Sequence, residues 1–173
     1  MTLKDIIAQS IRDNNGTIGF DAFMDLALYT PALGYYRRGG VIFGEQGDFI
    51  TAPETSDLFG YCLAKQCAPV INSGGNILEF GAGTGILAAQ ILFELARLDS
   101  LPQKYYILEL SGQLQQKQKK TISRVLPELV GRVQWISELP SDFSGAVIAN
   151  EVLDAMPAKR VRYRKGVFFE LAV

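Results

Sequence analysis

The chain has 173 residues, a length that suits one globular domain. Hydrophobic residues make up 48% of it and charged residues 20%, which excludes an intrinsically disordered chain. The 17 basic and 18 acidic residues nearly balance, so there is no electrostatic reason to expect nucleic acid or a membrane as a partner. The apolar runs are also too short for a membrane-spanning helix of about 20 residues.

The chain contains two cysteines and no histidine. Without an imidazole, Ser-His-Asp and Cys-His catalysis and imidazole-ligated zinc are excluded, and we expect no metal site. Cys62 and Cys67 point to different faces of an expected helix, so we expect two buried free thiols. Residues 1–15 lack the apolar block of a signal peptide, which predicts a cytosolic protein or a mature form whose presequence has been removed.

The first part of the chain, residues 1–72, is expected to be a helical and loop segment. Apolar residues recur at helical spacing behind Thr2, which fits an N-cap. Pro69 is expected to end the last helix of the segment, because proline lacks a backbone N–H. The expected elements are helices at 3–11 and 20–28, turns at 30–53, and a helix from Asp57 towards Cys67.

Residues 73–173 are expected to be a Rossmann-type α/β core, because short apolar strands alternate with helices. This alternation predicts a doubly wound, mainly parallel sheet. The polar helix in this half is expected to turn its Lys and Gln side chains to solvent. The tail alternates apolar and polar residues, which predicts a β-hairpin, and its cations are interpreted as a solvated strand face. The expected strands are 76–80, 104–110, 133–136 and 145–149, the helices 86–98 and 113–124, and the hairpin 160–173.

A glycine-rich motif, Glu79-Phe80-Gly81-Ala82-Gly83-Thr84-Gly85, joins the first expected strand to the helix after it. Glycines allow a tight turn and let a ligand approach the backbone closely. The helix that follows presents free N–H groups at the same place. Glu109 ends the second expected strand, where a carboxylate can accept hydrogen bonds from both hydroxyls of a ribose. This layout predicts a cofactor that contains a nucleoside.

Two classes of cofactor share this layout. The dinucleotide fingerprint G-x-G-x-x-G would need a glycine in place of Ile86, so a dinucleotide-dependent oxidoreductase is the weaker alternative. An acid two residues before G-x-G-x-G favours S-adenosylmethionine, because Glu79 can bind its cationic amino group. Trp135, at the end of the third strand, fits either contact with adenine or ordinary core packing. The candidate cofactor-binding residues are Glu79, Gly81, Ala82, Gly83, Gly85, Glu109, Leu110 and Asn150.

Two further carboxylates, Glu151 and Asp154, follow the fourth expected strand. In a doubly wound sheet, ligands bind outside the carboxyl ends of the strands. Glu151 and Asp154 are therefore the candidate catalytic residues, since a pair of carboxylates can orient a guanidinium and compensate its charge. Glu151 is the first candidate to receive a proton. The alternative interpretation is a solvated acid and a helix cap.

The combination of these stretches resembles the MidA family of bacterial and mitochondrial methyltransferases. The matching stretches are 27–29, Pro31, 34–36, 47–49, 51–54, 78–85, 107–111 and 149–157, which together extend over nearly the whole chain. The resemblance implies S-adenosylmethionine as methyl donor and an arginine on a protein partner as acceptor. For the mitochondrial member, that partner is a subunit of respiratory complex I. It also implies a cytoplasmic location in bacteria, or the mitochondrial matrix if a presequence has been removed.

Members of this family are longer and have more core strands, so we expect the 173 residues to be an incomplete enzyme. The cofactor pocket is then largely built, while methyl transfer is weak or absent. The rival interpretation is a non-catalytic fragment that binds a cofactor or a partner. The expected strand 145–149 would lie at an exposed sheet edge, which predicts self-association.

Overall fold

The computed structural model of the protein describes residues 1–37 and 51–173. The chain divides into two compact units: unit 1 comprises residues 1–40 and 153–173, and unit 2 comprises residues 41–152. The expected boundary between residues 72 and 73 falls inside unit 2 and stays a prediction. The family stretch 47–49 lies outside the described residues.

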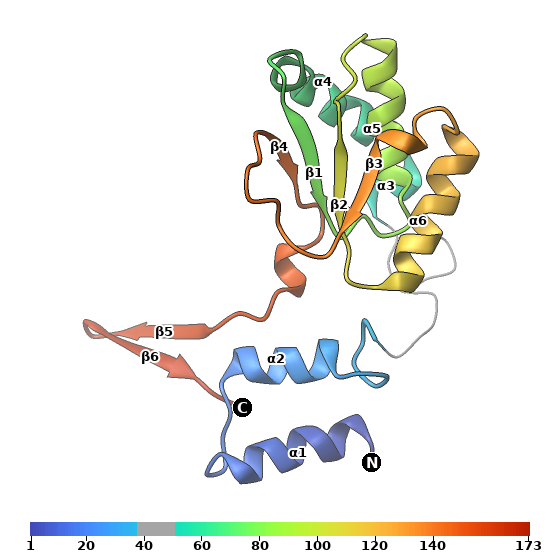
Figure 1. Ribbon diagram of the computed structural model, residues 1–173. Coiled ribbons are helices and arrows are strands. Elements are labelled where there is room, and N and C mark those ends of the chain that lie inside the picture. The colour runs from blue at the N-terminus through green and yellow to red at the C-terminus, as the bar shows by residue number, and fades with distance from the viewer. Residues whose placement is uncertain (38–50) are drawn as a thin grey trace. The chain divides into compact units, whose positions relative to one another are not determined.

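Unit 2 is built around a four-stranded parallel sheet in the order β3-β2-β1-β4 (Figure 1). The strands are β1 (Asn76–Phe80), β2 (Tyr105–Leu108), β3 (Val133–Ile136) and β4 (Gly145–Ile148). The predicted α/β fold class with a mainly parallel sheet is confirmed. Because β1 lies between β2 and β4, the residues that follow these three strands meet at one edge of the sheet.

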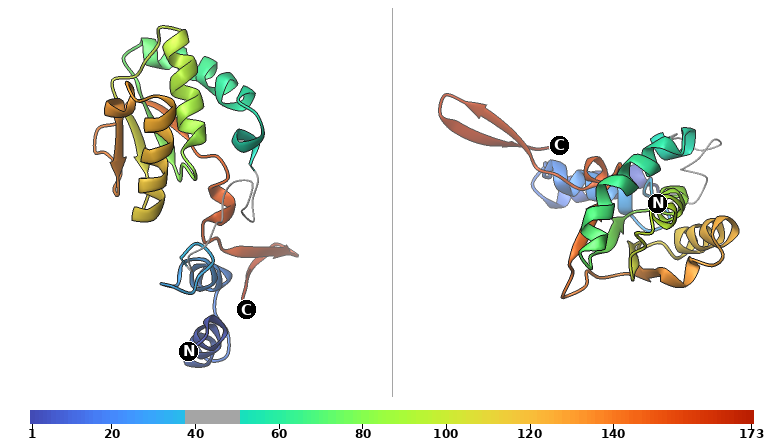
Figure 2. Two further views of the ribbon diagram at one scale, coloured as in Figure 1. Left: turned by 90° about the vertical axis from the view of Figure 1, so that its right-hand side faces the viewer. Right: turned by 90° about the horizontal axis from the view of Figure 1, so that it is seen from above.

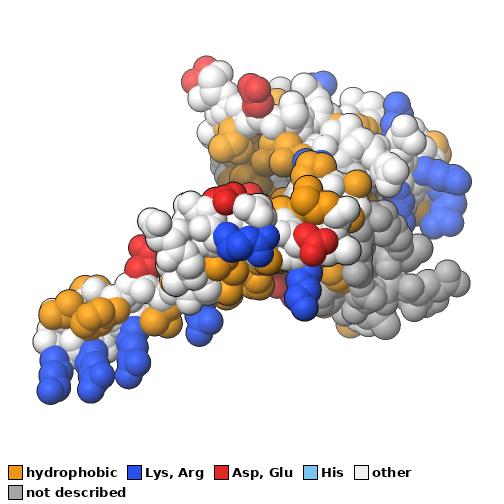
Figure 3. Space-filling model, turned by 90° about the horizontal axis from the view of Figure 1, so that it is seen from below, with side chains coloured by type: hydrophobic (Ala, Val, Ile, Leu, Met, Phe, Trp, Pro, Cys, Tyr) orange, Lys and Arg blue, Asp and Glu red, His pale blue; other side chains and the backbone are white. Residues whose placement is uncertain are grey.

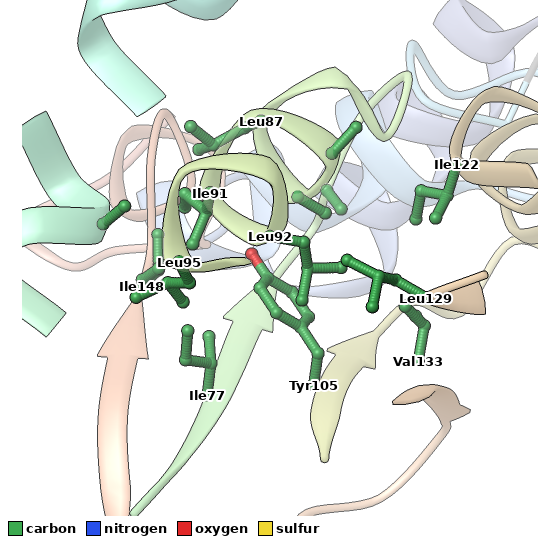
Figure 4. Close-up of a cluster of buried hydrophobic side chains, with 14 of the residues drawn as sticks. Ile77, Leu87, Ile91, Leu92, Leu95, Tyr105, Ile122, Leu129, Val133 and Ile148 are labelled. Carbon is green, nitrogen blue, oxygen red and sulfur yellow. The ribbon is translucent and has the colours of Figure 1, made fainter. Parts of the chain in front are cut away.

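Three long helices pack side by side on one face of this sheet (Figure 2). They are α4 (Leu58–Asn72), α5 (Ile86–Arg97) and α6 (Gly112–Val125), and unit 2 also contains the short helices α3 (Ala52–Thr55) and η1 (Val130–Arg132). The middle helix, α5, is buried at eight of its twelve residues. Figure 4 shows Leu87, Ile91 and Leu95 of α5 packed with Ile77 and Ile148 of the sheet. This apolar layer fixes the end of β1 against the start of α5.

Several local predictions for unit 2 are wrong. Helix α4 continues through Pro69 to Asn72, where Ile71 is buried in the core. The packing of that last turn offsets the backbone bond that proline cannot make. Residues 52–55 form the short helix α3, which begins within the turns expected at 30–53. Cys67 is buried as expected, but Cys62 is exposed, because only one face of α4 meets the core.

Unit 1 contains two helices and a hairpin. Helix α1 (Leu3–Asp13) begins with the predicted Thr2 cap, in which Thr2 and Asp5 satisfy each other's backbone N–H groups. Helix α2 (Phe20–Tyr29) follows, and the 3₁₀ turn η2 (Leu153–Ala155) belongs to the same unit. The predicted hairpin is confirmed as β5 (Arg160–Arg164) and β6 (Val167–Leu171).

The hairpin is attached to the α2 segment within unit 1. Ile18 exchanges two backbone hydrogen bonds with Val173, of 3.0 and 2.9 Å. Lys159 donates to Glu170 over 2.6 Å and lies 3.6 Å from Asp21. All residues of β5 are exposed, and Figure 3 shows the hairpin with cationic side chains on one side and apolar ones on the other. This exposure agrees with a solvated strand face. In the described part of the chain, no helix is long and apolar enough to cross a membrane.

Candidate cofactor site

A hollow lies at the carboxyl edge of the sheet in unit 2, where nucleoside cofactors bind in this class of fold. Its walls come from the glycine motif after β1, the residues after β4, the first turn of α5, and the segment before and within α3. The lining residues are Thr51, Pro53, Glu54, Glu79, Gly81, Ala82, Gly83, Thr84, Ile86, Leu87, Asn150 and Glu151. Six of the predicted site residues therefore line one hollow.

The three glycines of the motif all adopt left-handed backbone conformations, with φ of +55° at Gly81, +53° at Gly83 and +84° at Gly85. Such angles favour glycine over any residue with a Cβ. A Cβ at Gly81 would meet only a methyl of Val152 at 3.6 Å, so this glycine leaves its surroundings open. A Cβ at Gly85 would lie 2.9 Å from the Cα of Gln118, so Gly85 lets α6 approach the turn. The motif thus serves both ligand access and packing.

Glu79 is 2% exposed and lines the hollow near the end of β1. Its Oε2 accepts a 2.8 Å hydrogen bond from the hydroxyl of Tyr105. Burial raises the pKa of the Glu79 carboxyl to about 7, and the hydrogen bond from Tyr105 opposes that rise. A cationic ligand group would stabilise the ionised form of this buried carboxyl, because it would compensate the negative charge.

Glu109 follows β2 directly and is 8% exposed. Its Oε1 accepts a bond from the backbone N–H of Ser111 over 2.9 Å, and its Oε2 accepts one from Gln118 over 3.1 Å. An ionised carboxylate has about four lone-pair positions, so each oxygen retains capacity for a hydroxyl. Glu109 does not belong to the lining of the hollow itself, and its neighbour Leu110 is 71% exposed. The ribose contact at Glu109 and a role for Leu110 stay predictions.

Gln118 is a candidate site residue that was not recognised from the sequence pattern. It was expected on the solvent face of a polar helix, yet it is fully buried in α6. Its Nε2 lies within hydrogen-bond distance of Glu109 and of the Gly83 carbonyl at 3.2 Å, and its Oε1 accepts a bond from the Trp135 indole at 2.9 Å. The helical spacing of Leu114, Gln118 and Ile122 was the available signal.

The segment of α3 is tied to the glycine motif by polar contacts. The hydroxyl of Thr84 donates to Glu54, and both residues line the hollow. Gln90 of α5, which is 5% exposed, donates to the Pro53 carbonyl over 2.8 Å and to Asp57 over 2.9 Å. No role was predicted for Glu54 from the sequence, although it lies within one of the family stretches.

Asn150 and Glu151 follow β4 and complete the wall of the hollow. Glu151 is exposed and has a φ of +53°, an uncommon conformation for a residue that is not glycine, asparagine or aspartate. Such strain clusters at functional sites, since the surrounding structure must hold it. The exposed carboxylate has room to meet a substrate from outside. Its catalytic role stays a prediction.

Asp154, the second candidate catalytic residue, belongs to unit 1. It is exposed. Burial is the main cause that raises the pKa of the Tyr29 and Tyr36 phenols, and the negative charge of Asp154 adds to the rise for both. The two rings stack at 5.7 Å, and Tyr29 donates to the Ala155 carbonyl over 2.7 Å. Asp154 therefore stands beside a stacked pair of tyrosines, and its pairing with Glu151 stays a prediction.

The polar groups and the open glycine turn of unit 2 fit S-adenosylmethionine. Glu79 offers a buried carboxylate for the ammonium, Glu109 offers two acceptors for the ribose hydroxyls, and the glycine turn offers open backbone. Among the described residues that line the hollow there is neither Lys nor Arg. In the described residues, no cluster of three or more Cys, Asp or Glu side chains could hold a metal ion.

Comparisons with known proteins agree with this assignment. The family described as "Putative S-adenosyl-L-methionine-dependent methyltransferase" matches residues 62–173. The mitochondrial protein arginine methyltransferase NDUFAF7 of Xenopus laevis is 29% identical over 188 residues, covering 92% of this chain and 43% of the relative. The Bos taurus protein of that name is 32% identical and covers 85% of this chain and 39% of the relative.

A crystal structure of a Burkholderia thailandensis protein bound to S-adenosyl-homocysteine is also similar. It is 36% identical with a TM-score of 0.81, and the match covers 99% of this chain and 50% of that chain. The chain thus spans about half the length of the relatives that it matches. These matches confirm the predicted family resemblance and fold class, and S-adenosylmethionine as the cofactor of the family.

Proposed function

We propose a protein arginine methyltransferase role for this chain, which belongs to the family of S-adenosyl-L-methionine-dependent methyltransferases. The observation that carries the proposal is the meeting of Glu79 and the glycine turn at one hollow in unit 2, with Gln118 linking the turn to Glu109. In this assignment the chain contributes the half of the enzyme that binds S-adenosylmethionine. The acceptor is an arginine on a protein partner, in agreement with the names of the NDUFAF7 relatives.

Each site residue has one task in this proposal. Glu79 binds the ammonium of the cofactor, and Glu109 accepts hydrogen bonds from the two ribose hydroxyls. Asn150 forms the wall of the hollow next to β4. Gly81, Ala82, Gly83 and Gly85 keep the turn open to the ligand. When bound, the cofactor supplies a sulfonium-activated methyl group that needs alignment and exclusion of water rather than covalent help.

Glu151 is assigned to the acceptor. A guanidinium must lose a proton as its nitrogen becomes methylated, and a carboxylate within reach can orient the nitrogen and receive that proton. Two observations support this role: Glu151 is exposed where it lines the hollow, and its φ of +53° is uncommon for a glutamate.

The surroundings of Asp154 favour a guanidinium ligand in unit 1. A planar cation can stack on an aromatic face while its N–H groups bond to a carboxylate. Tyr29 and Tyr36 supply stacked rings, and Asp154 supplies the carboxylate close to both. A link to complex I and a mitochondrial or cytoplasmic location follow from the resemblance and from the relatives' names, and they stay predictions.

Calorimetric titration tests the cofactor assignment. We expect S-adenosylmethionine and S-adenosyl-homocysteine to bind, and a nicotinamide dinucleotide not to bind. Glu109→Ala should weaken binding by about 1.5–3 kcal/mol, the range for a hydrogen bond to a charged group. Gly83→Val should abolish binding, since a branched side chain would occupy the open turn. A dinucleotide that bound more tightly than S-adenosylmethionine would overturn the assignment.

A radiolabelled methyl-transfer assay with an arginine-containing protein tests the reaction. Glu151→Gln should lower transfer about 10²- to 10⁴-fold with little change in cofactor affinity. The exposed Glu128 lies outside the hollow, so Glu128→Gln serves as the matched control. Cofactor binding with no transfer to arginine from any protein would instead favour the non-catalytic binding fragment.

A further inference from the structure

The side chain of Gln118 joins three separate parts of the cofactor site. It reaches from α6 to the carbonyl of Gly83 in the glycine turn, to the carboxylate of Glu109 after β2, and to the indole of Trp135 in β3. It is fully buried, so no water competes for these bonds from outside. A single amide thus connects the residues assigned to the turn and to the ribose.

The polarity of its partners fixes the amide in one orientation. The indole of Trp135 can only donate, so it must face the Gln118 oxygen. The ionised carboxylate of Glu109 and the carbonyl of Gly83 can only accept, so both must face the Gln118 nitrogen. A rotation of the amide by half a turn would break all three bonds. Gln118 is therefore locked without help from any ligand.

The same bonds lock Glu109. Its Oε2 is held by Gln118 over 3.1 Å, and its Oε1 is held by the Ser111 N–H over 2.9 Å. With both oxygens restrained, the plane of the carboxylate cannot turn, and the unused lone pairs keep one direction. Binding two adjacent ribose hydroxyls requires such a fixed pair of acceptors. Without this restraint, the side chain would lose rotamer freedom on binding, at a cost in affinity.

We propose that Gln118 is a positioning residue that orients Glu109 and the glycine turn for the ribose of the cofactor. This inference rests on the proposed function. Gln118 does not itself bind the ligand but acts through Glu109 and the Gly83 carbonyl. Its removal should therefore weaken the recognition of the ribose hydroxyls more than the recognition of the rest of the cofactor.

The test compares S-adenosyl-homocysteine with its 2′-deoxy analogue by calorimetry. The wild type should bind the deoxy analogue more weakly, because one hydroxyl is missing. Gln118→Met keeps the length of the side chain but removes both polar atoms, so affinity for S-adenosyl-homocysteine should fall roughly tenfold or more. Affinity for the analogue should fall less, so the discrimination between the two ligands shrinks.

Gln118→Glu gives a sharper version of the same test. Its carboxylate would face the acceptors Glu109 and Gly83, and like charges at this distance disfavour the ionised pair. Compared with the wild type at the same pH, this variant should bind S-adenosyl-homocysteine most weakly at high pH. The difference should shrink as the pH falls and the two carboxylates share a proton. Gln116→Glu introduces the same charge at an exposed position of α6 and is the matched control.

The outcomes separate this inference from the function on which it rests. If the wild type fails to bind S-adenosyl-homocysteine, the proposed function fails. If it binds and Gln118→Met lowers both affinities equally or neither, Gln118 does not position the ribose site. If both Gln118 variants fail to fold, Trp135→Phe removes the donor that locks the amide oxygen, together with part of the indole ring, so the discrimination between the two ligands and not the affinity alone is compared. Unchanged discrimination in that variant would also overturn the inference.

Discussion

The two units of this chain are stabilised in different ways. In unit 2, eight residues of α5 are buried, and the sheet and three helices enclose one continuous apolar cluster. In unit 1, neither α1 nor α2 has a buried residue, and among the described residues of the unit only Ile18 and Gly34 are buried. Unit 1 depends instead on a capping box, ion pairs, ring stacking and the backbone bonds of a hairpin.

This contrast matches the tasks that we assign to the units. A cofactor site needs fixed atoms, and the packed core of unit 2 holds the glycine turn and Glu109 in place. The guanidinium site that we propose beside Asp154 in unit 1 must admit part of a large partner, and Asp154 is exposed. We therefore expect substitutions to have large effects in unit 2 and small effects in unit 1.

The largest effect is expected from a cavity in the core of unit 2. Leu92 is fully buried in α5, so Leu92→Ala should lower the free energy of unfolding by about 2–5 kcal/mol. Phe168 in unit 1 is 72% exposed, and Phe168→Ala should change the free energy of unfolding by less than about 0.5 kcal/mol. Denaturation followed through Trp135, the chain's single tryptophan, reports on unit 2. Equal losses in both variants would contradict the contrast between the units.

A second effect should depend on pH. The pKa of Glu79 is raised from 4.5 to about 7, so its contribution to stability is fully present below pH 4.5 and is lost as the pH rises to about 7. The loss amounts to on the order of 3 kcal/mol. Glu79→Gln should therefore be more stable than the wild type at pH 8, with little difference at pH 4. If the unfolding free energies of Glu79→Gln and the wild type differ by the same amount at pH 4 and at pH 8, the titration of Glu79 does not affect stability.

The same carboxyl should affect the cofactor. Binding of a cationic ammonium favours the ionised form of Glu79, so affinity for S-adenosyl-homocysteine should fall as the pH drops below about 7. In Glu79→Gln, affinity should be lower and no longer change between pH 5 and pH 7. Calorimetry at several pH values measures this, and Glu128→Gln should retain the profile of the wild type.

A smaller effect should come from a methyl group on a left-handed backbone. Gly81 in unit 2 and Gly16 in unit 1 have φ of +55° and +91°, and neither site would bring a new Cβ into close contact. Alanine at either position should cost about 1–2 kcal/mol of local stability. Gly81→Ala should shift the unfolding seen by Trp135 and weaken cofactor binding. Gly16→Ala should change only hydrogen exchange in unit 1, and a shift in the Trp135 transition would contradict separate stabilisation.

The smallest effect is expected at the ion pairs of unit 1. Lys159 contacts Glu170 and Asp21 but is exposed, so solvent screens both interactions. Lys159→Met should leave the unfolding of unit 2 unchanged and slightly increase hydrogen exchange in β6. Hydrogen exchange with mass spectrometry would detect the increase in β6, and Lys4→Met in α1 is the control. A large loss would show that these charges, rather than the hairpin backbone, hold unit 1 together.

The sequence by itself determined the elements whose signals are local. The apolar run of β1, the glycines after it and the start of α5 were all predicted, because turn chemistry and periodicity act between neighbouring residues. The Thr2 cap and the hairpin followed from the same kind of signal. The adjacency of β1 and β4, and with it the meeting of Glu79 and Glu151 at one hollow, followed from the topology of the fold class.

Only the tertiary structure decided the rest. The last turn of α4 survives Pro69 because Ile71 is buried, and local rules cannot weigh that gain against the lost backbone bond. Gln118 is one of several polar residues in α6, and only the packing of the helix shows which one is buried. Its three partners lie 9, 17 and 35 residues away along the chain and belong to different segments. Composition and spacing place residues along an element, whereas burial and hydrogen-bond partners depend on which other elements cover it.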